Sequence, residues 1–593
     1  MSGKRPIGHF AGDFSGPTPL RPYRWLPIGP TLGLLLLVSL GGWGACSGRG
    51  RDATANVPPA EAQPGPPSFT LFALAEVRGQ LGPCGCTSDP LGDLARTAQV
   101  INDARAKGPV LVVDAGSLLY AKANPGPAHA AQEEKKAELL VRAYQDNLKV
   151  AAIGLGPADL VAGPGNVRPA RQLANATADS NVPVEAPKIV KVGDVNVGIF
   201  GVSEADAVVG VAVTDPVAAG KAAVAQLRQD GAAVIVGLLQ SSSKRNVLAL
   251  AKAIGGIDFA VAGLGSAAPE PDQISPRAED LGDGTFLIVP SNRGQIISRV
   301  DVMIKNPGPF TDAVGPGAAR DVATQLDRQL ASLDKDLAAF AADPNADQAF
   351  VTSKKSERAA IAADKAALAR MPWRMPANGS FFGFEQVKIN KALGCDAAIQ
   401  KATNEYNLAV GRANVAFAAT QPVAKLPKSA PRYVGGEACA DCHQEAVDFW
   451  KTTRHAQAWK TLEDRSQQFD LDCISCHVTG WDKPSGATMV QNEHLRDVQC
   501  ETCHAPSSIH VANGGEDKPL SIMKEPPQDL CASSCHTKEH SDTFDFKPYL
   551  RDVLGPGHGE NERKRLGDGP TGKSLRSAAL EKAGKLLGPG CMK

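Results

Sequence analysis

The stretch Cys439-Ala-Asp-Cys442-His443 is the first of four similar motifs in the C-terminal part of this chain. The others are Cys473-Ile-Ser-Cys476-His477, Cys500-Glu-Thr-Cys503-His504 and Cys531-Ala-Ser-Ser-Cys535-His536, the last with one extra residue between its cysteines. Two thiols one helical turn apart can form thioethers with the vinyl groups of a haem, and the histidine after them can bind its iron. The motifs therefore predict four covalently attached haems c.

The alternative for the same cysteine pairs is a pair of zinc sites. It is disfavoured because a histidine follows every pair immediately. We therefore predict that all twelve cysteines and histidines of the motifs bind haem. The proximal iron ligands would be the four motif histidines, His443, His477, His504 and His536.

Histidines are concentrated around these motifs. Nine of the eleven lie between residues 443 and 558, and five of those nine are not part of a motif. These five are His455, His494, His510, His540 and His558. A haem iron held by one histidine has a sixth position to fill, so this surplus favours two histidines on most or all irons.

The stretch from Tyr433 to Gly559 resembles the cytochrome c554 family. The resemblance rests on four pieces of sequence: Tyr433-Val-Gly-Gly-x-x-Cys439, Trp450-x-x-Thr453-Arg-His455-Ala-x-Ala458, Cys473-x-x-Cys476-His-Val-Thr-Gly480, and Val498-Gln-Cys500-Glu-x-Cys503-His504-Ala-Pro-x-x-x-His510. It implies tightly packed haem pairs, little regular secondary structure and distal histidines from elsewhere in the domain. On this resemblance the distal candidates are His455, His510, His540 and His558, whereas His494 is expected on a surface loop.

The ligand supply favours electron transfer through bis-histidine haems, because a six-coordinate iron cannot bind substrate without losing a ligand. The alternative, since the family includes enzymes with one open iron, is a multihaem oxidoreductase acting on a small nitrogen or sulfur compound. Expected partners are periplasmic or membrane redox proteins. Equal numbers of basic and acidic residues, 63 of each, give no indication of nucleic-acid binding.

The N-terminus has the features of an export signal. Residues 1–46 combine a basic leader, the apolar run 31–40 and small residues before Cys46. This pattern resembles a bacterial lipoprotein signal, with Cys46 as the lipidated residue, although Trp43 departs from it; an uncleaved anchor is the alternative. Residues 47–68 read as a flexible tether. The expected location is the periplasmic side of a bacterial membrane, or alternatively the cell surface.

Residues 69–306 alternate short apolar strands with amphipathic helices, which predicts an α/β layered fold. Expected strands are 110–116, 195–202, 232–239, 258–265 and 285–291, and expected helices are 93–107 and 215–231. The order of these pieces resembles the metallophosphatase domain of the 5′-nucleotidase family. An unrelated α/β domain is the alternative.

That family holds two metal ions with Asp, His and Asn at the strand ends, and these residue types are missing here. The replaced positions are the run Leu71–Arg78, which has no Asp-x-His pair, Asp114 to Ser117, Gly154 to Pro157, Gln240, and Gly263 to Ser266. We expect a phosphatase-like domain without metal ligands that serves as an accessory module. A phosphohydrolase carrying a redox module is the less favoured alternative.

Four cysteines lie outside the signal and the motifs. Cys84 and Cys86 are too close in sequence to bond each other easily, so they could pair with Cys395 or Cys591, bind a thiophilic metal, or remain free thiols.

Residues 307–430 read as a helical region with an antiparallel hairpin, a strand at 381–390, a helix at 396–418 and a closing linker. Residues 431–560 form the predicted tetrahaem domain, mostly α or irregular, and 561–593 form a charged tail. The whole chain is thus expected to be multidomain.

Overall fold

The computed structural model describes residues 64–83, 87–344, 346–422, 425–584 and 591. The expected export signal with Cys46, most of the tether, and the pair Cys84 and Cys86 lie outside these residues. Within the described ranges, no helix is both long enough and apolar enough to span a bilayer.

The first sheet of the α/β region is mixed. Its six strands run in the order β13-β14-β12-β1-β2-β3. They are β1 (Phe69–Leu74), β2 (Val110–Asp114), β3 (Ala152–Ile153), β12 (Ile296–Met303), β13 (Thr311–Asp312) and β14 (Phe381–Lys388). β1 pairs in parallel with β2 and antiparallel with β12. The carboxyl ends of β1, β2 and β3 therefore lie at one edge.

The second sheet also has six strands, in the order β10-β11-β9-β8-β7-β6. They are β6 (Lys188–Val192), β7 (Val195–Ser203), β8 (Val234–Gln240), β9 (Phe259–Gly263), β10 (Glu279–Asp280) and β11 (Phe286–Ile288). β8 is buried along its whole length, as expected for an apolar central strand covered on both faces. A separate pair joins β4 (Arg171–Gln172) to β5 (Val184–Glu185).

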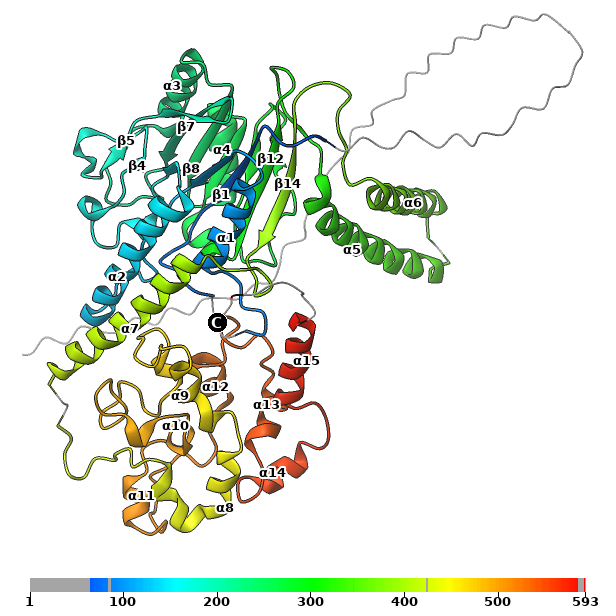
Figure 1. Cartoon of the computed structure of the whole chain (residues 1–593). Coiled ribbons are helices and arrows are strands. Elements are labelled where there is room, and N and C mark those ends of the chain that lie inside the picture. Colours follow the sequence, from blue (N-terminus) through cyan, green and yellow to red (C-terminus); the bar gives the residue numbers. More distant parts are fainter. Residues whose placement is uncertain (1–63, 84–86, 345, 423–424, 585–590, 592–593) are drawn as a thin grey trace, which may run out of the picture. The chain divides into compact units, whose positions relative to one another are not determined.

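The two sheets pack face to face between layers of helices (Figure 1). Side chains of β1, β2, β12 and β14 share one core with those of β7, β8, β9 and β11. The outer face of the first sheet packs on α1 (Leu94–Arg105), α2 (Pro127–Ala143) and α7 (Ala397–Ala419). The outer face of the second packs on α3 (Pro216–Gln229) and α4 (Lys244–Ile254). The predicted α/β layered fold is confirmed.

The boundary drawn at residue 306 is corrected by the structure. β14 pairs antiparallel with β12 along eight residues, from Ile296 with Lys388 to Met303 with Phe381. α7 packs against α1 and α2 through Ile399 and its neighbours. The strand at 381–388 and the helix after it therefore belong to the α/β layers, because the apolar side chains of β14 complete the core between the sheets.

The predicted helical hairpin is present as α5 (Gly315–Ala342) and α6 (Gln348–Arg370), which lie side by side (Figure 1). Its antiparallel register is fixed by three contacts. Phe340 packs edge-on against Phe350 with ring centroids 5.5 Å apart, and ion pairs join Asp334 to Arg358 and Asp327 to Lys365.

The motif-bearing region consists of short helices joined by irregular segments. These helices are α8 (Ala440–Lys451), α9 (Ala458–Glu463), α10 (Cys500–His504), α11 (Ser508–Ala512), α12 (Gln528–Ser534) and α13 (Phe546–Val553). Its apolar core is small and is centred on Trp459, Ile474 and Leu495. Such a small core suits a domain whose interior is completed by a large cofactor.

After this region come α14 (Glu560–Arg565), α15 (Gly572–Gly584) and Cys591. Cys591 forms a disulfide with Cys395 across 196 residues of sequence. The sequence left open whether Cys84 or Cys86 pairs with one of these two cysteines. In the structure Cys395 and Cys591 bond each other instead.

Candidate functional site: a haem-binding cavity and a strand-end cluster

A large cavity opens among the short helices of the motif-bearing region. Its volume is about 3890 Å³, and its wall includes every cysteine and histidine of the four motifs. Among the described residues, the eight motif cysteines form no disulfide. The region therefore offers the space, the thiols and the imidazoles that attached haems require.

The third motif shows how the chain positions these groups. Its five residues form the single-turn helix α10, so Cys500 and Cys503 are one turn apart. Between them the buried Glu501 accepts hydrogen bonds from the backbone N–H groups of Val434, Gly435 and Ser507 at 2.7–3.1 Å. This carboxylate ties the motif to the segment that precedes the first motif.

The motifs approach each other in pairs. Cys439 of the first motif and Cys500 of the third are hydrogen-bond partners. Cys476 of the second and Cys535 of the fourth are partners in the same way. The first motif thus lies beside the third, and the second beside the fourth.

Two pairs of histidine rings approach each other in the cavity wall. The ring centroids of His455 and His536 are 6.2 Å apart with an angle of 43° between the ring planes, and those of His504 and His558 are 5.9 Å apart at 89°. In each pair one histidine belongs to a motif and the other to the predicted distal set. An imidazole on a metal has a metal–nitrogen distance of about 2 Å, which puts its centroid about 3 Å from the metal, so two rings on opposite sides have centroids about 6 Å apart. Both separations fit one iron between two rings.

The orientation of the rings is set by hydrogen bonds at Nδ1. In His477, His504 and His558 this nitrogen donates to the carbonyl oxygens of Ala458, Met523 and Val553 at 2.5, 2.7 and 2.9 Å. In His510 it pairs with the Asp517 carboxylate at 2.8 Å. A carbonyl oxygen can only accept, so Nδ1 carries the proton and Nε2 is the nitrogen that can bind a metal.

Burial favours the neutral form of three imidazoles in the cavity wall. It lowers the pKa of His455, and together with the proximity of His455 it lowers the pKa of His536 to about 4. Burial likewise lowers the pKa of His504. Neutral imidazole is the form that binds metals, so at neutral pH no proton has to leave before ligation.

The three remaining histidines of this region outside the motifs differ in their position relative to the cavity. His510 and His540 also line the cavity, and His540 lies close enough to Cys476 of the second motif to influence the pKa of its thiol. His494 is exposed and is not part of the cavity wall. The structure thus brings together the four predicted distal candidates and leaves His494 outside.

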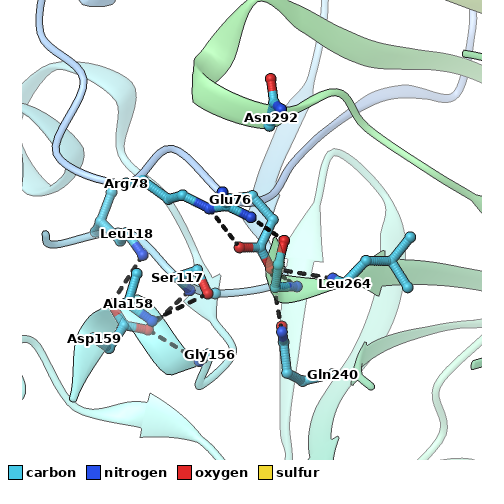
Figure 2. A network of polar contacts seen from close by, with 12 residues as sticks. Glu76, Arg78, Ser117, Leu118, Gly156, Ala158, Asp159, Gln240, Leu264 and Asn292 are labelled. Carbon is cyan, nitrogen blue, oxygen red and sulfur yellow. Dashed lines mark hydrogen bonds and ion pairs between the residues drawn. The ribbon is translucent and has the colours of Figure 1, made fainter. Parts of the chain in front are cut away.

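The strand ends of the α/β region form a second polar cluster (Figure 2). The buried Glu76 carboxylate, just after β1, accepts from Arg78 Nε at 3.2 Å and from Gln240 Nε2 at 3.2 Å. It also accepts from the backbone N–H groups of Leu264 and Gly265 at 3.1 and 2.8 Å. Arg78 reaches the Gly265 carbonyl oxygen as well. The sequence positions that differ from the phosphatase family therefore do converge.

A second buried carboxylate, that of Asp159, bonds the backbone of two neighbouring loops. Asp159 is buried, pairs with the equally buried Arg171 at 2.9 Å, and accepts from the backbone N–H groups of Ser117, Leu118, Leu119 and Gly156 (Figure 2). Asp159 thereby joins the loop after β2 to the loop after β3 through contacts within the chain.

The retained acid Asp114, at the end of β2, accepts from Tyr144 Oη at 2.8 Å and from the Gly116 N–H at 2.7 Å. Burial raises the pKa of its carboxyl to about 7, against the opposing effect of these hydrogen bonds. This acid is satisfied by its own chain and is poised near neutrality, unlike an ionised metal ligand.

These strand ends do not fit a two-metal site. Within the described ranges, one group of three metal-ligating side chains is close enough to share an ion, and it is Asp93 with Cys395 and Cys591, not the strand-end cluster. Histidine is replaced there by arginine and glutamine, whose groups already bond Glu76. We therefore derive no metal chemistry at this position.

Sequence reasoning missed the residues that support the haem site. Asp517 orients His510, and Glu501 holds the third motif, yet neither role leaves a pattern in one sequence. Asp159 was also missed, because it lies two residues beyond the loop where the family pattern places its ligands. A buried acid after a Gly-rich turn was the only signal available.

The motif-bearing region matches a known family. Residues 438–505 match the family model described as cytochrome c554 and c-prime. The motif-bearing region is thus similar to c-type cytochromes of the cytochrome c554 family. A curated relative, cytochrome c-554 of Nitrosomonas europaea, is 32% identical over 97 residues, which are 14% of this chain and 41% of that protein. The chain therefore spans about two fifths of that relative.

Solved structures similar to this chain include phosphatase-type proteins. A 5′-nucleotidase precursor from Thermus thermophilus is 17% identical with a TM-score of 0.38, covering 65% of this chain and 67% of that one. A calcineurin-like phosphoesterase from Bacillus subtilis is 19% identical with a TM-score of 0.31, covering 40% and 85%. Neither likeness bears on activity.

Proposed function

We propose that this protein is an exported, membrane-tethered tetrahaem cytochrome that transfers electrons through bis-histidine haems. Haem supplies a reversible one-electron couple, and closed ligation reserves it for electron transfer. The observation that carries the proposal is the close approach of two pairs of imidazoles, His455 with His536 and His504 with His558, in the wall of a cavity lined by all four motifs.

The same geometry supports two of the ligand assignments that we propose, and the other two rest on proximity and on elimination. His536 takes His455 as its distal partner, and His504 takes His558. His540 serves the second motif, since it lies near Cys476, and His510 then serves the first. His510 and His558 would bind iron through Nε2, because Nδ1 of each is already bonded to the Asp517 carboxylate and to the Val553 carbonyl oxygen.

The α/β region is proposed to be an accessory domain without hydrolase activity. The support is the Glu76–Arg78 ion pair, which occupies the strand ends where a metal would need ionised carboxylates and histidines. Attachment to a membrane through Cys46 or the N-terminal segment, a location on the periplasmic side, and periplasmic or membrane redox partners complete the proposal.

The test is low-temperature EPR on haem-loaded protein, with haem quantified per chain. Four haems that are all low-spin would support four closed irons. A high-spin signal that shifts on addition of nitrite or hydroxylamine would replace the proposal with a multihaem oxidoreductase. Metal-dependent release of phosphate from a nucleotide would refute the accessory role of the α/β region.

A further inference from the structure

The Cys395–Cys591 disulfide lies on the wall of the same cavity that the haem motifs line. Cys395 precedes α7 and packs partly buried against the core beneath the first sheet. Cys591 comes from the C-terminal tail. The bridge thus places a redox-capable group on the wall of the space that the haems would fill.

A half-buried carboxylate stands next to this disulfide. An oxygen of Asp93 and the two sulfur atoms all lie within 4.8 Å of one another. Asp93 has φ of 145°, a backbone conformation that residues other than glycine rarely adopt and that is costly to maintain. Burial raises the pKa of its carboxyl, against the lowering effect of the hydrogen bonds from Ala95 and Arg96 N–H and of the Arg96 guanidinium 3.9 Å away.

Hydrogen bonds connect this corner to the fourth haem motif. The backbone N–H and the hydroxyl of Ser88, in the loop that leads to Asp93, donate to the Asp542 carboxylate. Arg576 of α15 donates to Asp542 at 3.0 Å and to the Thr87 carbonyl oxygen at 3.1 Å. Asp542 follows His536 by six residues, so the disulfide corner is held against the segment that leaves the fourth motif.

We propose that the Cys395–Cys591 disulfide is a redox site that exchanges two electrons with the haems of this chain. The inference rests on the proposed function, because ferrous haems are its reductant. Reduction breaks the S–S bond, each sulfur takes one electron and one proton, and two haem irons pass from ferrous to ferric. One proton comes from Asp93, which is reprotonated by water, and the other comes from solvent. The reverse reaction reforms the bond and returns both electrons.

The test is a coulometric reductive titration of the haem-loaded full chain, with haem content measured independently. The protein should take up two electrons more than the Cys395→Ser/Cys591→Ser double variant at equal haem content. Alkylation after quenching should label both cysteines in the reduced protein and neither in the oxidised one. Equal electron uptake in the two proteins, or cysteines that stay unlabelled after full haem reduction, would make the bridge purely structural.

This readout separates the inference from the proposed function. A haem content below four per chain refutes the tetrahaem proposal, while the two-electron difference still decides the inference. Haem-free protein treated with the same one-electron donor should show no labelling of Cys395 or Cys591, although its free motif cysteines will be labelled. Labelling there at the same rate would overturn the haems as the reductant.

The role of Asp93 has its own variant. Asp93→Asn keeps an N-cap for α1 and removes the acidic proton. We expect disulfide reduction to slow by about 100-fold while haem reduction is unchanged. Asp215→Asn, which changes the equivalent cap of α3 away from the cavity, is the matched control. Equal rates in the two variants would remove Asp93 from the reaction.

Discussion

The strand-end cluster and the haem cavity use polar side chains in opposite ways. At the strand ends, Glu76 and Asp159 are bonded on all sides by the chain's own donors. In the cavity, His504 and His558 are held by backbone carbonyl oxygens at Nδ1, so Nε2 is the nitrogen that can bind a metal. The difference distinguishes a site that has become part of the scaffold from one prepared for a cofactor.

The largest expected effect is loss of a haem. Changing Cys500 and Cys503 to serine removes both thioethers of the third motif, so haem content should fall by one per chain, measured by haem absorbance and intact mass. Gln240→Ala, which alters the strand-end cluster, should leave haem content unchanged. Equal haem content in the two variants would mean that the third motif attaches no haem, and the contrast between the cavity and the strand-end cluster would fail.

Removal of a distal histidine should change the spin state of one iron. His455→Ala leaves the iron on His536 with an open position, so EPR should show one high-spin centre in place of a low-spin one. His494→Ala is the matched control and should keep every centre low-spin, because His494 is exposed and outside the cavity wall. A high-spin centre in the His494 variant would reverse our choice of ligands.

Substitutions in the strand-end cluster should lower the stability of the α/β region and leave the haem content unchanged. Glu76→Ala leaves the Gln240 amide and the N–H groups of Leu264 and Gly265 without their acceptor, which should cost about 2–3 kcal/mol. Glu185→Ala removes a more exposed ion pair with Lys188 and should cost less than about 1 kcal/mol. The measurement is urea-dependent hydrogen exchange of β1 and β9 peptides. A stability gain in Glu76→Ala would mean that the cluster is strained.

The fold could be predicted to different depths in different regions. The apolar run 232–239 identified strand β8 (Val234–Gln240) because buried parallel strands consist almost entirely of apolar residues. The membership of β14 in the first sheet could not be predicted, since a strand separated from β12 by a helical hairpin carries no sign of its partner. Helix α2 was not predicted because polar residues interrupt the apolar spacing along its sequence.

The candidate site shows the same limit. The motifs identified the proximal histidines because covalent attachment demands fixed spacing, whereas the pairing of His455 with His536 depends on folding of the long segment between them. Counting histidines predicted how many ligands exist but not which iron each one serves. The Cys395–Cys591 bridge was equally invisible, since four unassigned cysteines allow several pairings.

The last expected effect is a change in the pH dependence of stability, and it concerns Asp114 at the end of β2. Burial raises its pKa from 3.8 to about 7 in the folded protein, so the folded state binds a proton that the unfolded state has lost between these values. The folded α/β region should therefore lose stability as pH rises from about 4 to 7, by at most about 1.4 kcal/mol per pH unit from this group. Asp114→Asn cannot titrate and should flatten this slope, measured by hydrogen exchange of β2 peptides at several pH values. An unchanged slope would mean that Asp114 is ionised at neutral pH, as a metal ligand would be, and the contrast between the two regions would weaken.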